Sequence, residues 1–528
     1  MKCSVLTRCA SAGALSFTLV YPALAQEALP TIDIGSESGR AGAAPELGPG
    51  GRFTGYAADF KKPAASAKSD IPLLQTPFNI QKVSRETLDD RQAINLKDAV
   101  LDNVSGVSVS YQQLDRFVVR GFDLNHEIYR NGLRTPWAAG RDTANLQSIE
   151  VLKGPAAMLY GRVEPGGLVN LVTKRPLFEP YYSIQEQTGS FGLTRTTVDA
   201  TGPLTSDKSL AYRVNGVYAR SDSFRDFVTS RNILIAPVVT WRPIEQFRLN
   251  VEAELRDSVF ADVGDIGIPA VGKTPADVPV GRYLGDPTIV LGRPNRQKTA
   301  FAGYDWTYDI DADWSVTNRF GYNFEMARRT SVYIAALDEA TGIAQRSAYL
   351  MDRSTNNVTT NLDVKGAFTT GFLKHRVLLG FDYLNAELRD SGYDGGLPFL
   401  APINIYAPVY SGLRLSSFGS DYNVFLRRKE SWKGLYGQDF ISFADDRLHV
   451  LLGGRYDWSN YGSSYSSNSM FEADANFRSA SDKAFSPTVG VVVQPQPWLT
   501  VPSRIVLKLA DAAPRQSRIS DQAARSMG

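Results

Sequence analysis

The sequence predicts a mostly β protein in which a compact α+β domain precedes a long series of antiparallel strands suited to a transmembrane barrel. Three observations predict this fold class. The chain of 528 residues contains 44 Gly, 24 Tyr and 26 Phe, which suits many short strands and tight turns. From about residue 180, apolar and polar residues alternate along segments of roughly ten residues. Beyond residue 26, no apolar run approaches the ~18 residues that cross a bilayer as a helix.

The first 25 residues are expected to be a signal peptide. Lys2 and Arg8 give a positive start, an apolar stretch runs from Cys9 to Val20, and Ala23–Ala25 has the A-x-A pattern of a cleavage site. A short transmembrane anchor is the alternative, but the apolar run is too short and too rich in small residues. We therefore expect export and cleavage after Ala25.

Cleavage changes the cysteine and charge counts. Both cysteines, Cys3 and Cys9, leave with the signal peptide, so no disulfide framework is expected. Removing Lys2 and Arg8 from 57 basic residues leaves 55 against 55 acidic ones. A mature chain near zero net charge argues against nucleic acid as a partner.

Residues 26–69 are expected to form a flexible linker. The stretch 35–69 is rich in Gly, Ala, Pro and Ser and has few large apolar groups that could order it. Before it lies LPTIDIG (29–35), a short alternating apolar stretch. Taken alone, this stretch is typical of a fraying terminus.

Residues 70–176 are expected to form an α+β domain of ~100 residues. Ser84 can cap a short helix that carries Leu88, and Asn95 with Asp98 resembles a capping box for a second helix that ends at Gly106. Four strands follow, at residues 107–111, 117–122, 127–133 and 149–154.

Alternation with period two dominates after residue 180. In FRLNVEAELR (247–256) the apolar residues share one face, and Arg248, Asn250, Glu252, Glu254 and Arg256 share the other. Residues 210–220 and 448–458 repeat the pattern. A soluble sandwich strand also alternates, but the number and length of the segments and the Tyr or Trp at their ends favour a membrane barrel. We expect about 14 strands up to residue 493, with exterior loops at 259–296 and 389–420.

The segment IEVLKGPAAMLYGRVEPGGLVNLVTKRP (149–176) places many chain breakers between two strand-like runs. Gly154-Pro155 ends the first strand, because proline cannot donate to a ladder. Gly161, Gly166 and Gly167 allow tight turns and close packing against a surrounding wall. A phosphate-binding loop is the competing interpretation, but no Gly-Lys-Ser/Thr follows and the helix is missing.

This segment, together with FVVRGFDLNHEIYRNGLR (117–134), resembles the plug-domain signature of TonB-dependent outer-membrane receptors, with siderophore receptors as the most similar branch. Downstream stretches agree in the same order, among them SFRDFV (223–228), WKGLYGQD (432–439) and AFSPTVGVV (484–492). The resemblance covers residues from about 70 to 499. It implies a plug at 70–176 inside an antiparallel barrel that begins at 177.

The C-terminal part departs from this family. The family closes 22 strands, whereas about 14 fit before residue 500, so an incomplete barrel is expected at 177–500. Family chains end in a strand with a terminal aromatic residue that the barrel-assembly machinery reads. Residues 501–528 lack this feature and read like out-of-frame translation, so a truncated product is expected.

The resemblance implies a receptor and active transporter in the outer membrane, not an enzyme. It would import a ferric siderophore as a monomer, energised by TonB, the inner-membrane complex of TonB and the proton-motive force. No cofactor is expected, because the iron arrives caged by siderophore oxygens. The alternatives are a non-transporting remnant and a haem receptor, for which His126 is the candidate ligand. A passive porin fits less well because it carries no plug motif.

The resemblance also assigns site residues. Polar groups at the contact of plug and barrel would be Arg120, Glu150, Lys153 and Arg162. We hypothesise that such groups, Arg120 among them, form ion pairs with inward barrel carboxylates such as Glu252 or Glu254. The TonB box is expected at Leu29, Pro30, Thr31, Ile32, Asp33 and Ile34. The remaining plug-motif residues are Gly121, Gly154, Pro155, Gly161, Pro165, Gly166 and Gly167. Candidate ligand contacts in apical turns are Tyr111, Gln112, Arg116 and Trp137.

Overall fold

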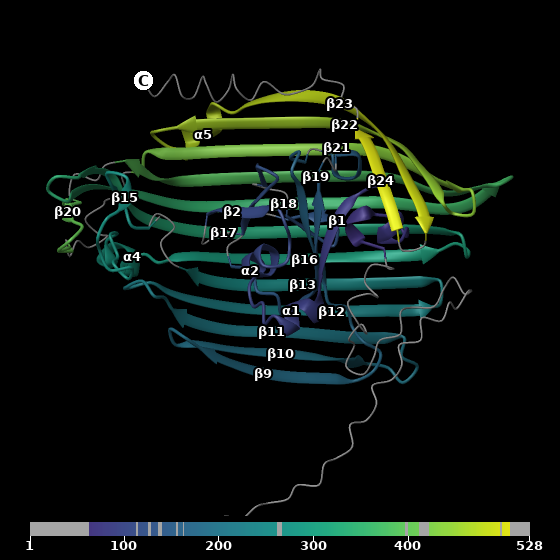
Figure 1. Ribbon diagram of the computed structural model, residues 1–528, viewed down its shortest axis with the longest axis horizontal. Coiled ribbons are helices and arrows are strands. Elements are labelled where there is room, and N and C mark those ends of the chain that lie inside the picture. Colours follow the sequence, from purple (N-terminus) through teal and green to yellow (C-terminus); the bar gives the residue numbers. More distant parts are fainter. Residues whose placement is uncertain are drawn as a thin grey trace, which may run out of the picture. The chain divides into compact units, whose positions relative to one another are not determined.

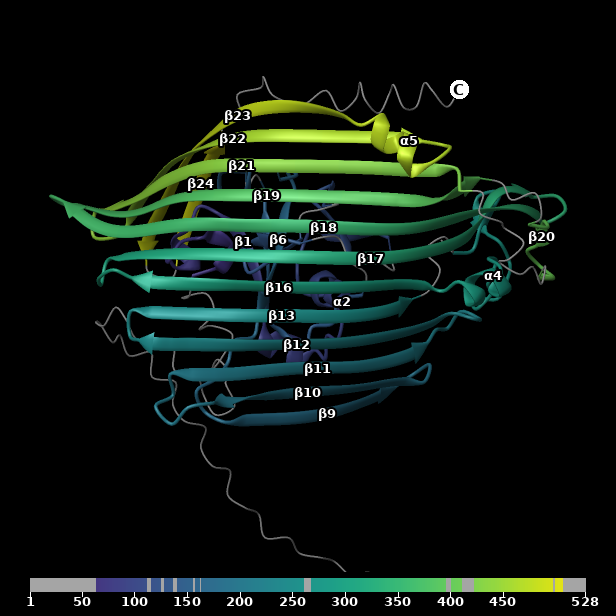
Figure 2. The same ribbon diagram turned by 180° about the vertical axis from the view of Figure 1, so that it is seen from behind.

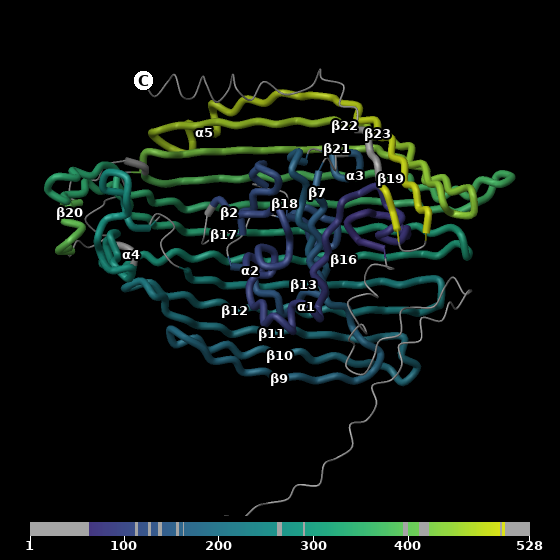
Figure 3. Tube along the Cα trace, viewed as in Figure 1, coloured from purple at the N-terminus to yellow at the C-terminus, as the bar shows by residue number. Residues whose placement is uncertain are grey.

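The computed structural model describes residues 63–506, with gaps at 112–114, 125–127, 136–139, 155–156, 162, 261–266, 396–399, 411–421 and 497–498. The expected signal peptide and TonB box lie outside the described residues, as do Gln112, His126, Trp137, Pro155 and Arg162. Figure 3 follows the trace from a purple and blue N-terminal domain to teal, green and yellow strands.

The N-terminal domain combines two small sheets with short helices. A five-stranded mixed sheet has the order β1-β7-β8-β5-β6, in which only the β5–β8 pair is parallel, and β2-β3-β4 form a second, antiparallel sheet. The strands are β1 (Asn79–Ser84), β2 (Val107–Tyr111), β3 (Arg116–Val119), β4 (Phe122–Leu124), β5 (Ile128–Arg130), β6 (Leu133–Arg134), β7 (Leu146–Lys153) and β8 (Gly167–Thr173). The helices are η2 (Ala65–Ala67), η3 (Leu73–Gln75), α1 (Arg85–Asp90), α2 (Leu96–Leu101) and α3 (Ala157–Tyr160).

The two predicted helix caps are confirmed. The Ser84 hydroxyl accepts a hydrogen bond from the Thr87 N–H at 3.2 Å, and the Asn95 Oδ1 accepts one from the Asp98 N–H at 2.8 Å. Each cap satisfies a backbone donor that the first helical turn leaves unpaired. The helices then bury Leu88 and Leu96 against the sheet, where their side chains are 1% and 0% exposed.

Two of the four predicted strands are hairpins. Residues 117–122 divide at Arg120 and Gly121, and residues 127–133 divide at Asn131 and Gly132. All four residues have positive φ, at 52°, 85°, 49° and 83°. Two consecutive residues with positive φ make the tight turn that matches the twist of a two-residue hairpin.

One large antiparallel sheet forms most of the rest of the described chain, and its strands lie side by side in sequence order (Figures 1 and 2). Its strands are β9 (Tyr181–Gly189), β10 (Leu193–Pro203), β11 (Leu210–Asp222), β12 (Thr229–Ile244), β13 (Phe247–Phe260), β16 (Asn295–Asp309), β17 (Trp314–Asp338), β18 (Ile343–Thr370), β19 (Leu373–Gly395), β21 (Val424–Phe443), β22 (Leu448–Ser466), β23 (Arg478–Gln496) and β24 (Leu499–Val506). With β20 (Ile403–Asn404), which pairs with β18, they make the 14 strands of the described sheet. The path ends at β9 and β24, which do not pair with each other.

The expected boundary at residue 500 falls inside a strand. Residues 501–506 belong to β24, which pairs with β23 from Thr488 to Gln496. Residues 507–528 of the expected tail lie outside the described residues.

The two faces of the large sheet differ in polarity, and the exposed face is the apolar one, as contact with lipid requires. On β13 the side chains of Asn250, Glu252 and Arg256 are buried, whereas Val251 and Leu255 are 50% and 58% exposed. A soluble sheet buries its apolar face, so this inversion is typical of a barrel strand with lipid outside. The described part of the chain has no helix of the length and apolarity needed to span a bilayer.

The expected exterior loops are partly ordered. The connection between β13 and β16 contains β14 (Ala270–Val271), β15 (Thr274–Pro275) and α4 (Pro287–Gly292), and α5 (Met470–Ala475) joins β22 to β23. Ala276 and Leu284 of the first connection pack with Ala344 on β18 and with Ile403 and Ile405. These loops therefore have a small apolar core of their own beyond the end of the sheet.

Candidate functional site between the N-terminal domain and the large sheet

Arg130 makes the most deeply buried ionic contact between the N-terminal domain and β13. Its Nη2 donates to Glu252 Oε2 at 2.9 Å, and its Nη1 donates to Glu254 Oε2. Asn131 Nδ2 donates to Glu252 Oε1 at 2.9 Å, and Asn145 Nδ2 donates to Glu254 Oε2 at 2.7 Å. Burial disfavours the charged guanidinium, but the two carboxylates outweigh it and raise the pKa of Arg130. The cluster therefore stays ionised and holds β5 to the sheet.

The hypothesis that Arg120 pairs with Glu252 or Glu254 is wrong. Both carboxylates receive Arg130, and Arg120 is exposed at the β3–β4 turn, where its φ is 52°. The turn points the Arg120 Nη1 toward Gly154, 3.3 Å from where a Cβ would stand. No alternation of polar and apolar residues pointed to Arg130, because all three residues of β5 are buried.

Glu150 and Lys153 are satisfied inside the N-terminal domain, not at its contact with the sheet as expected. The Glu150 carboxylate accepts the backbone N–H groups of Ala65 at 3.0 Å and Ser66 at 2.7 Å, and so caps the η2 turn. The Lys153 ammonium donates to Gln81 Oε1 at 2.5 Å and to the Ser105 carbonyl. Burial, and then the nearby Arg120 charge, lower the pKa of Lys153.

A second contact with the sheet is made by Lys68, directly after η2. Its side chain is 4% exposed, and its Nζ donates to the Tyr436 hydroxyl on β21 at 3.0 Å. The ammonium also lies 4.5 Å from the ring centroid of Tyr436 and 4.8 Å from that of Tyr160 on α3. The Asp382 Oδ2 is 4.0 Å away. Burial lowers the pKa of Lys68, and the charge of Asp363 opposes that shift.

The Lys68 site continues into the sheet wall through Arg455 on β22. Arg455 donates to both oxygens of Asp382 at 2.7 Å, and Tyr436 donates to Asp363 Oδ1 at 2.5 Å. Gly161 packs against this arginine, since a Cβ at residue 161 would lie 2.8 Å from Arg455 Nη2. The expected close packing of Gly161 against a surrounding wall is therefore present.

A third contact joins the domain to β10 and β11. Asp142 accepts two hydrogen bonds from Arg195, at 2.9 Å and 2.7 Å, and both side chains are buried. The Lys174 ammonium donates to Asp199 Oδ2 at 2.9 Å, and Arg213 donates two hydrogen bonds to the same carboxylate, at 2.8 Å and 2.7 Å. Burial lowers the pKa of Lys174 to about 8 although Asp199 opposes the shift.

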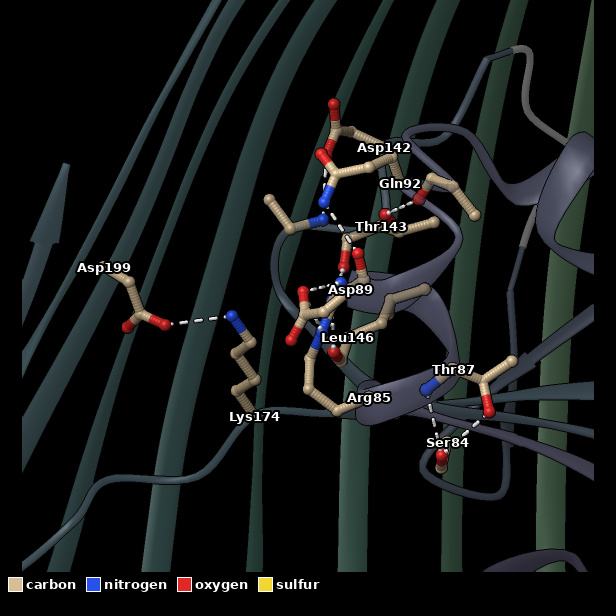
Figure 4. Close-up of polar contacts among 12 residues, drawn as sticks. Ser84, Arg85, Thr87, Asp89, Gln92, Asp142, Thr143, Leu146, Lys174 and Asp199 are labelled. Atoms are coloured by element: carbon tan, nitrogen blue, oxygen red, sulfur yellow. Dashed lines mark hydrogen bonds and ion pairs between the residues drawn. The ribbon is translucent and has the colours of Figure 1, made fainter. Parts of the chain in front are cut away.

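Figure 4 shows how α1 holds the loop that carries Asp142. Arg85 donates to the backbone carbonyls of Thr143 at 2.7 Å and Leu146 at 3.0 Å, and to Asp89 on its own helix at 2.7 Å. Lys174 points away from this group toward Asp199 on β10. The guanidinium thus holds the loop in which Asp142, the residue before Thr143, reaches Arg195 on the wall.

Two cavities flank the Asp142–Arg195 pair. One, of about 290 Å³, lies between α1 and the inner faces of β9–β11 and is lined by polar side chains such as Gln92, Gln187 and Asp199. The other, of about 250 Å³, lies toward the loop ends of β11–β13. Ile94 and Arg195 line both cavities, and Asp142 lines the second one.

The predicted ligand contacts are only partly described. Arg116 pairs with Asp123 across the β3–β4 hairpin, with atoms 2.9 Å and 2.7 Å apart. The backbone of Tyr111 ends β2, and its side chain is outside the described set together with Gln112 and Trp137. The predicted ligand site stays a prediction.

Two family models match this chain. The model described as TonB-dependent Receptor Plug Domain matches residues 72–168, and the model described as TonB dependent receptor-like, beta-barrel matches residues 240–505, about half of the 528 residues. The chain belongs to the TonB-dependent receptor family. The N-terminal domain is the plug and the large sheet is barrel wall, so the predicted fold class is confirmed. The predicted outer-membrane localisation is confirmed with it, in a family of receptors rather than of enzymes.

Curated relatives share about a quarter of the aligned residues. The ferrichrome outer membrane transporter/phage receptor of Escherichia coli (strain K12) is 26% identical over 440 residues, which are 76% of this chain and 57% of the relative. The metal-pseudopaline receptor CntO of Pseudomonas aeruginosa PAO1 is 29% identical over 463 residues, 85% of this chain and 62% of the relative. The chain therefore spans about three fifths of the length of the curated relatives it matches.

Solved receptor structures share the fold. The open form of the ferric-catecholate import receptor Fiu from E. coli K12 has a TM-score of 0.72 at 20% identity, covering 84% of this chain and 72% of that chain. The siderophore receptor PiuA from Acinetobacter baumannii has a TM-score of 0.72 at 19% identity, covering 83% and 66%. At this identity the likeness concerns the fold alone.

Proposed function

We propose that this receptor imports ferric siderophores across the outer membrane, energised by TonB. Three relatives support the class, because they are named as receptors for ferrichrome, ferrioxamine B and catecholate siderophores. The observation that carries the proposal is the Arg130 cluster, since a plug held by buried charges against the barrel wall suits a gated importer and not an open pore. The iron is cargo, already caged by the chelator, and we propose no resident cofactor.

The N-terminal edge of the plug would receive the force. The expected TonB box at Leu29–Ile34 precedes η2, and an extended segment of this kind can add as a strand to a partner sheet. Glu150 and Lys68 anchor the first described residues after that box, one to the plug and one to the wall. Pulling on the segment would load these two contacts before it loads the Arg130 cluster.

A second candidate function is chelate binding without transport. The observation that favours it is that β9 and β24, the two ends of the described sheet, do not pair with each other. Within the described residues each edge therefore presents backbone groups that lipid cannot satisfy. In this case the plug and the adjoining wall would bind the chelate but not pass it.

Uptake in whole cells separates the two candidates. The full chain is expressed in a host lacking its own siderophore receptors, with and without TonB, and given ⁵⁵Fe-labelled ferrichrome, ferrioxamine B or a ferric catecholate. Import predicts accumulation of at least one chelate that is lost without TonB. Binding without accumulation supports the second candidate, and the absence of both for every chelate overturns the two together.

A further inference from the structure

The Lys68 ammonium occupies a cation site that is built largely by the barrel wall. It lies 4.5 Å from the ring centroid of Tyr436 and 4.8 Å from that of Tyr160, and it donates to the Tyr436 hydroxyl at 3.0 Å. The Oδ2 of Asp382 on β19 is 4.0 Å away, and the charge of Asp363 on β18 also attracts the ammonium. Aromatic faces beside carboxylates are the groups that recognise organic ammonium ions. We call these four residues the ammonium cage: Tyr160, Tyr436, Asp363 and Asp382.

The wall side of the cage is negatively charged without Lys68. Within the described residues, the ion-pair network that contains the two cage carboxylates consists of three aspartates and two arginines, namely Asp363, Asp382, Asp457, Arg319 and Arg455. Arg455 donates to Asp382 and Asp457 at 2.7 Å, and Arg319 donates to Asp363 at 2.8 Å. Three carboxylates against two guanidinium groups leave one negative charge, which the Lys68 ammonium balances.

The cage holds the ammonium without filling the space around it. An ammonium has three N–H donors, but that of Lys68 makes one hydrogen bond to the described residues. A cavity of about 50 Å³ lies beside it, lined by Asn361 and Trp432 among others. Asn361 is buried, and within the described residues its Oδ1 accepts no hydrogen bond. The site therefore has room for water around the ammonium and does not require the exact position of a lysine side chain.

Lys68 reaches the cage through a strained turn. It is the C-cap of η2, where its φ is 53° and its N–H donates to the Ala65 carbonyl at 3.2 Å. This left-handed conformation is disfavoured for residues with a Cβ, and helix ends of this kind usually carry glycine. Departure of Lys68 from the cage relieves that strain, so the contact is suited to release under load.

Release of Lys68 would empty the wall side of the cage. A pull on the segment before η2 reaches Lys68 early, whereas Tyr436, Asp363 and Asp382 stay with the barrel strands. The network would then carry one negative charge without a partner, in a place where unpaired charge is costly. An organic cation that passes along the wall would be bound by the groups that now hold Lys68.

We propose that, once Lys68 has left, the wall side of the cage binds a primary ammonium group of the chelate, so that this receptor favours chelates with a free primary amine. The identity of the cargo rests on the proposed import function. The cage as a site for alkylammonium ions does not depend on transport. Acetylation of the amine removes its charge and its attraction to the Tyr436 ring, so an acetylated chelate should lose the preference.

Chemical rescue tests the cage without transport. K68A removes the side chain beyond Cβ, whose atoms n-propylammonium reproduces. In the purified full chain in detergent, K68A should expose the segment around η2 to protease, and about 100 mM n-propylammonium should slow this cleavage about tenfold. 1-Propanol, which has the same chain length and no charge, should leave the rate unchanged.

K365A is the matched control. Lys365 is also on the wall and donates to Asp70 of the same segment at 2.8 Å, but it is outside the cage. For K365A we expect n-propylammonium to change the cleavage rate by less than about twofold. The double variants K68A/D382N and K68A/Y436L should lose the rescue, because each lacks one of the groups that bind the cation.

Three outcomes would overturn the cage: no rescue of K68A, equal rescue by 1-propanol, or equal rescue of K365A. If K68A does not fold, as judged by circular dichroism, K68G replaces it. Glycine suits a φ of 53°, and n-butylammonium then reproduces the missing atoms.

Uptake decides whether the cage selects cargo. Cells that express the full chain receive a ⁵⁵Fe-labelled trihydroxamate chelate that ends in a primary amine, or its N-acetylated form. The parent chain should import the amine form about fivefold faster, and D382N should import the two forms at rates within about twofold of each other. Equal uptake of both forms by the parent chain would overturn the cargo preference even where rescue succeeds. Absence of uptake of either form would contradict the import function instead, and rescue would then decide the cage alone.

Discussion

Arg130 of the plug donates to Glu252 of β13 across 2.9 Å, and both side chains are less than one tenth exposed. A buried pair of this kind holds two elements together mainly because breaking it leaves a buried charge without a partner. The pair is therefore the first place to perturb plug seating.

Replacing Arg130 with glutamine should loosen the plug from the wall. Glu252 and Glu254 would be left buried without their cation, which costs about 3–5 kcal/mol. Urea unfolding and limited proteolysis of the plug measure the loss. R120Q is the matched control, because Arg120 is exposed, and it should shift stability by less than about 0.5 kcal/mol. Equal effects of the two variants would contradict the assignment.

Replacing Glu150 with alanine should free the η2 segment. The backbone N–H groups of Ala65 and Ser66 lose their carboxylate acceptor, a change worth about 1–3 kcal/mol. Hydrogen exchange at these two amides should speed up about tenfold or more. Glu164, which lies in the turn before β8, supplies the control E164A, and a similar acceleration in that variant would refute the capping role.

Lys174 should make the free energy of unfolding increase with pH in the alkaline range. Its pKa is about 8 in the folded protein and about 10.5 when unfolded, so between these values the unfolded state binds more protons. Stability should therefore rise as the pH goes from 8 to 10.5, by at most about 3 kcal/mol from this group. Urea unfolding of the parent chain and of K174M between pH 8 and 10.5 measures this rise in stability. K174M should lose the rise, and identical slopes would contradict the expectation.

Gly167→Ala should be far more damaging than Gly106→Ala. Both glycines have positive φ, +123° and +66°, but a Cβ at residue 167 would lie 1.8 Å from the Leu152 carbonyl oxygen, whereas nothing lies within 4 Å of one at residue 106. The open site costs only the left-handed backbone penalty of about 1–2 kcal/mol. The blocked site must separate β7 from β8, so we expect several kcal/mol or failure to fold. Thermal unfolding of both variants compares them.

Local chemistry explains which parts of the fold could be predicted. The caps at Ser84 and Asn95 depend on residues nearby in the sequence. The alternation of polar and apolar residues along β13 depends on adjacent residues, so both features can be predicted from the sequence. The turns at Arg120–Gly121 and Asn131–Gly132 were missed as hairpins because the apolar residues around them suggested continuous strands. Asn-Gly is a hairpin signal that could have found the second turn.

The contacts of the site depend on residues far apart in the chain, so the sequence could not assign them. Glu252 and Glu254 were expected to receive a plug cation, but which arginine reached them depended on where each hairpin pointed. Lys68 meets Tyr436 across 368 positions of sequence, and no local pattern signals that contact. The family motif identifies the plug, but only the position of the plug against the barrel wall shows which plug side chain contacts which wall side chain.

The most direct test of the account is the initial rate of ⁵⁵Fe-chelate uptake by cells that carry Ile32→Pro in the expected TonB box. Proline removes a backbone donor that strand addition needs, so we predict unchanged chelate binding at the cell surface and loss of energised uptake. I32A, which keeps the backbone donor, serves as the control and should retain most of the rate. Uptake by I32P at the parental rate would contradict the proposal that TonB energises this receptor through that segment.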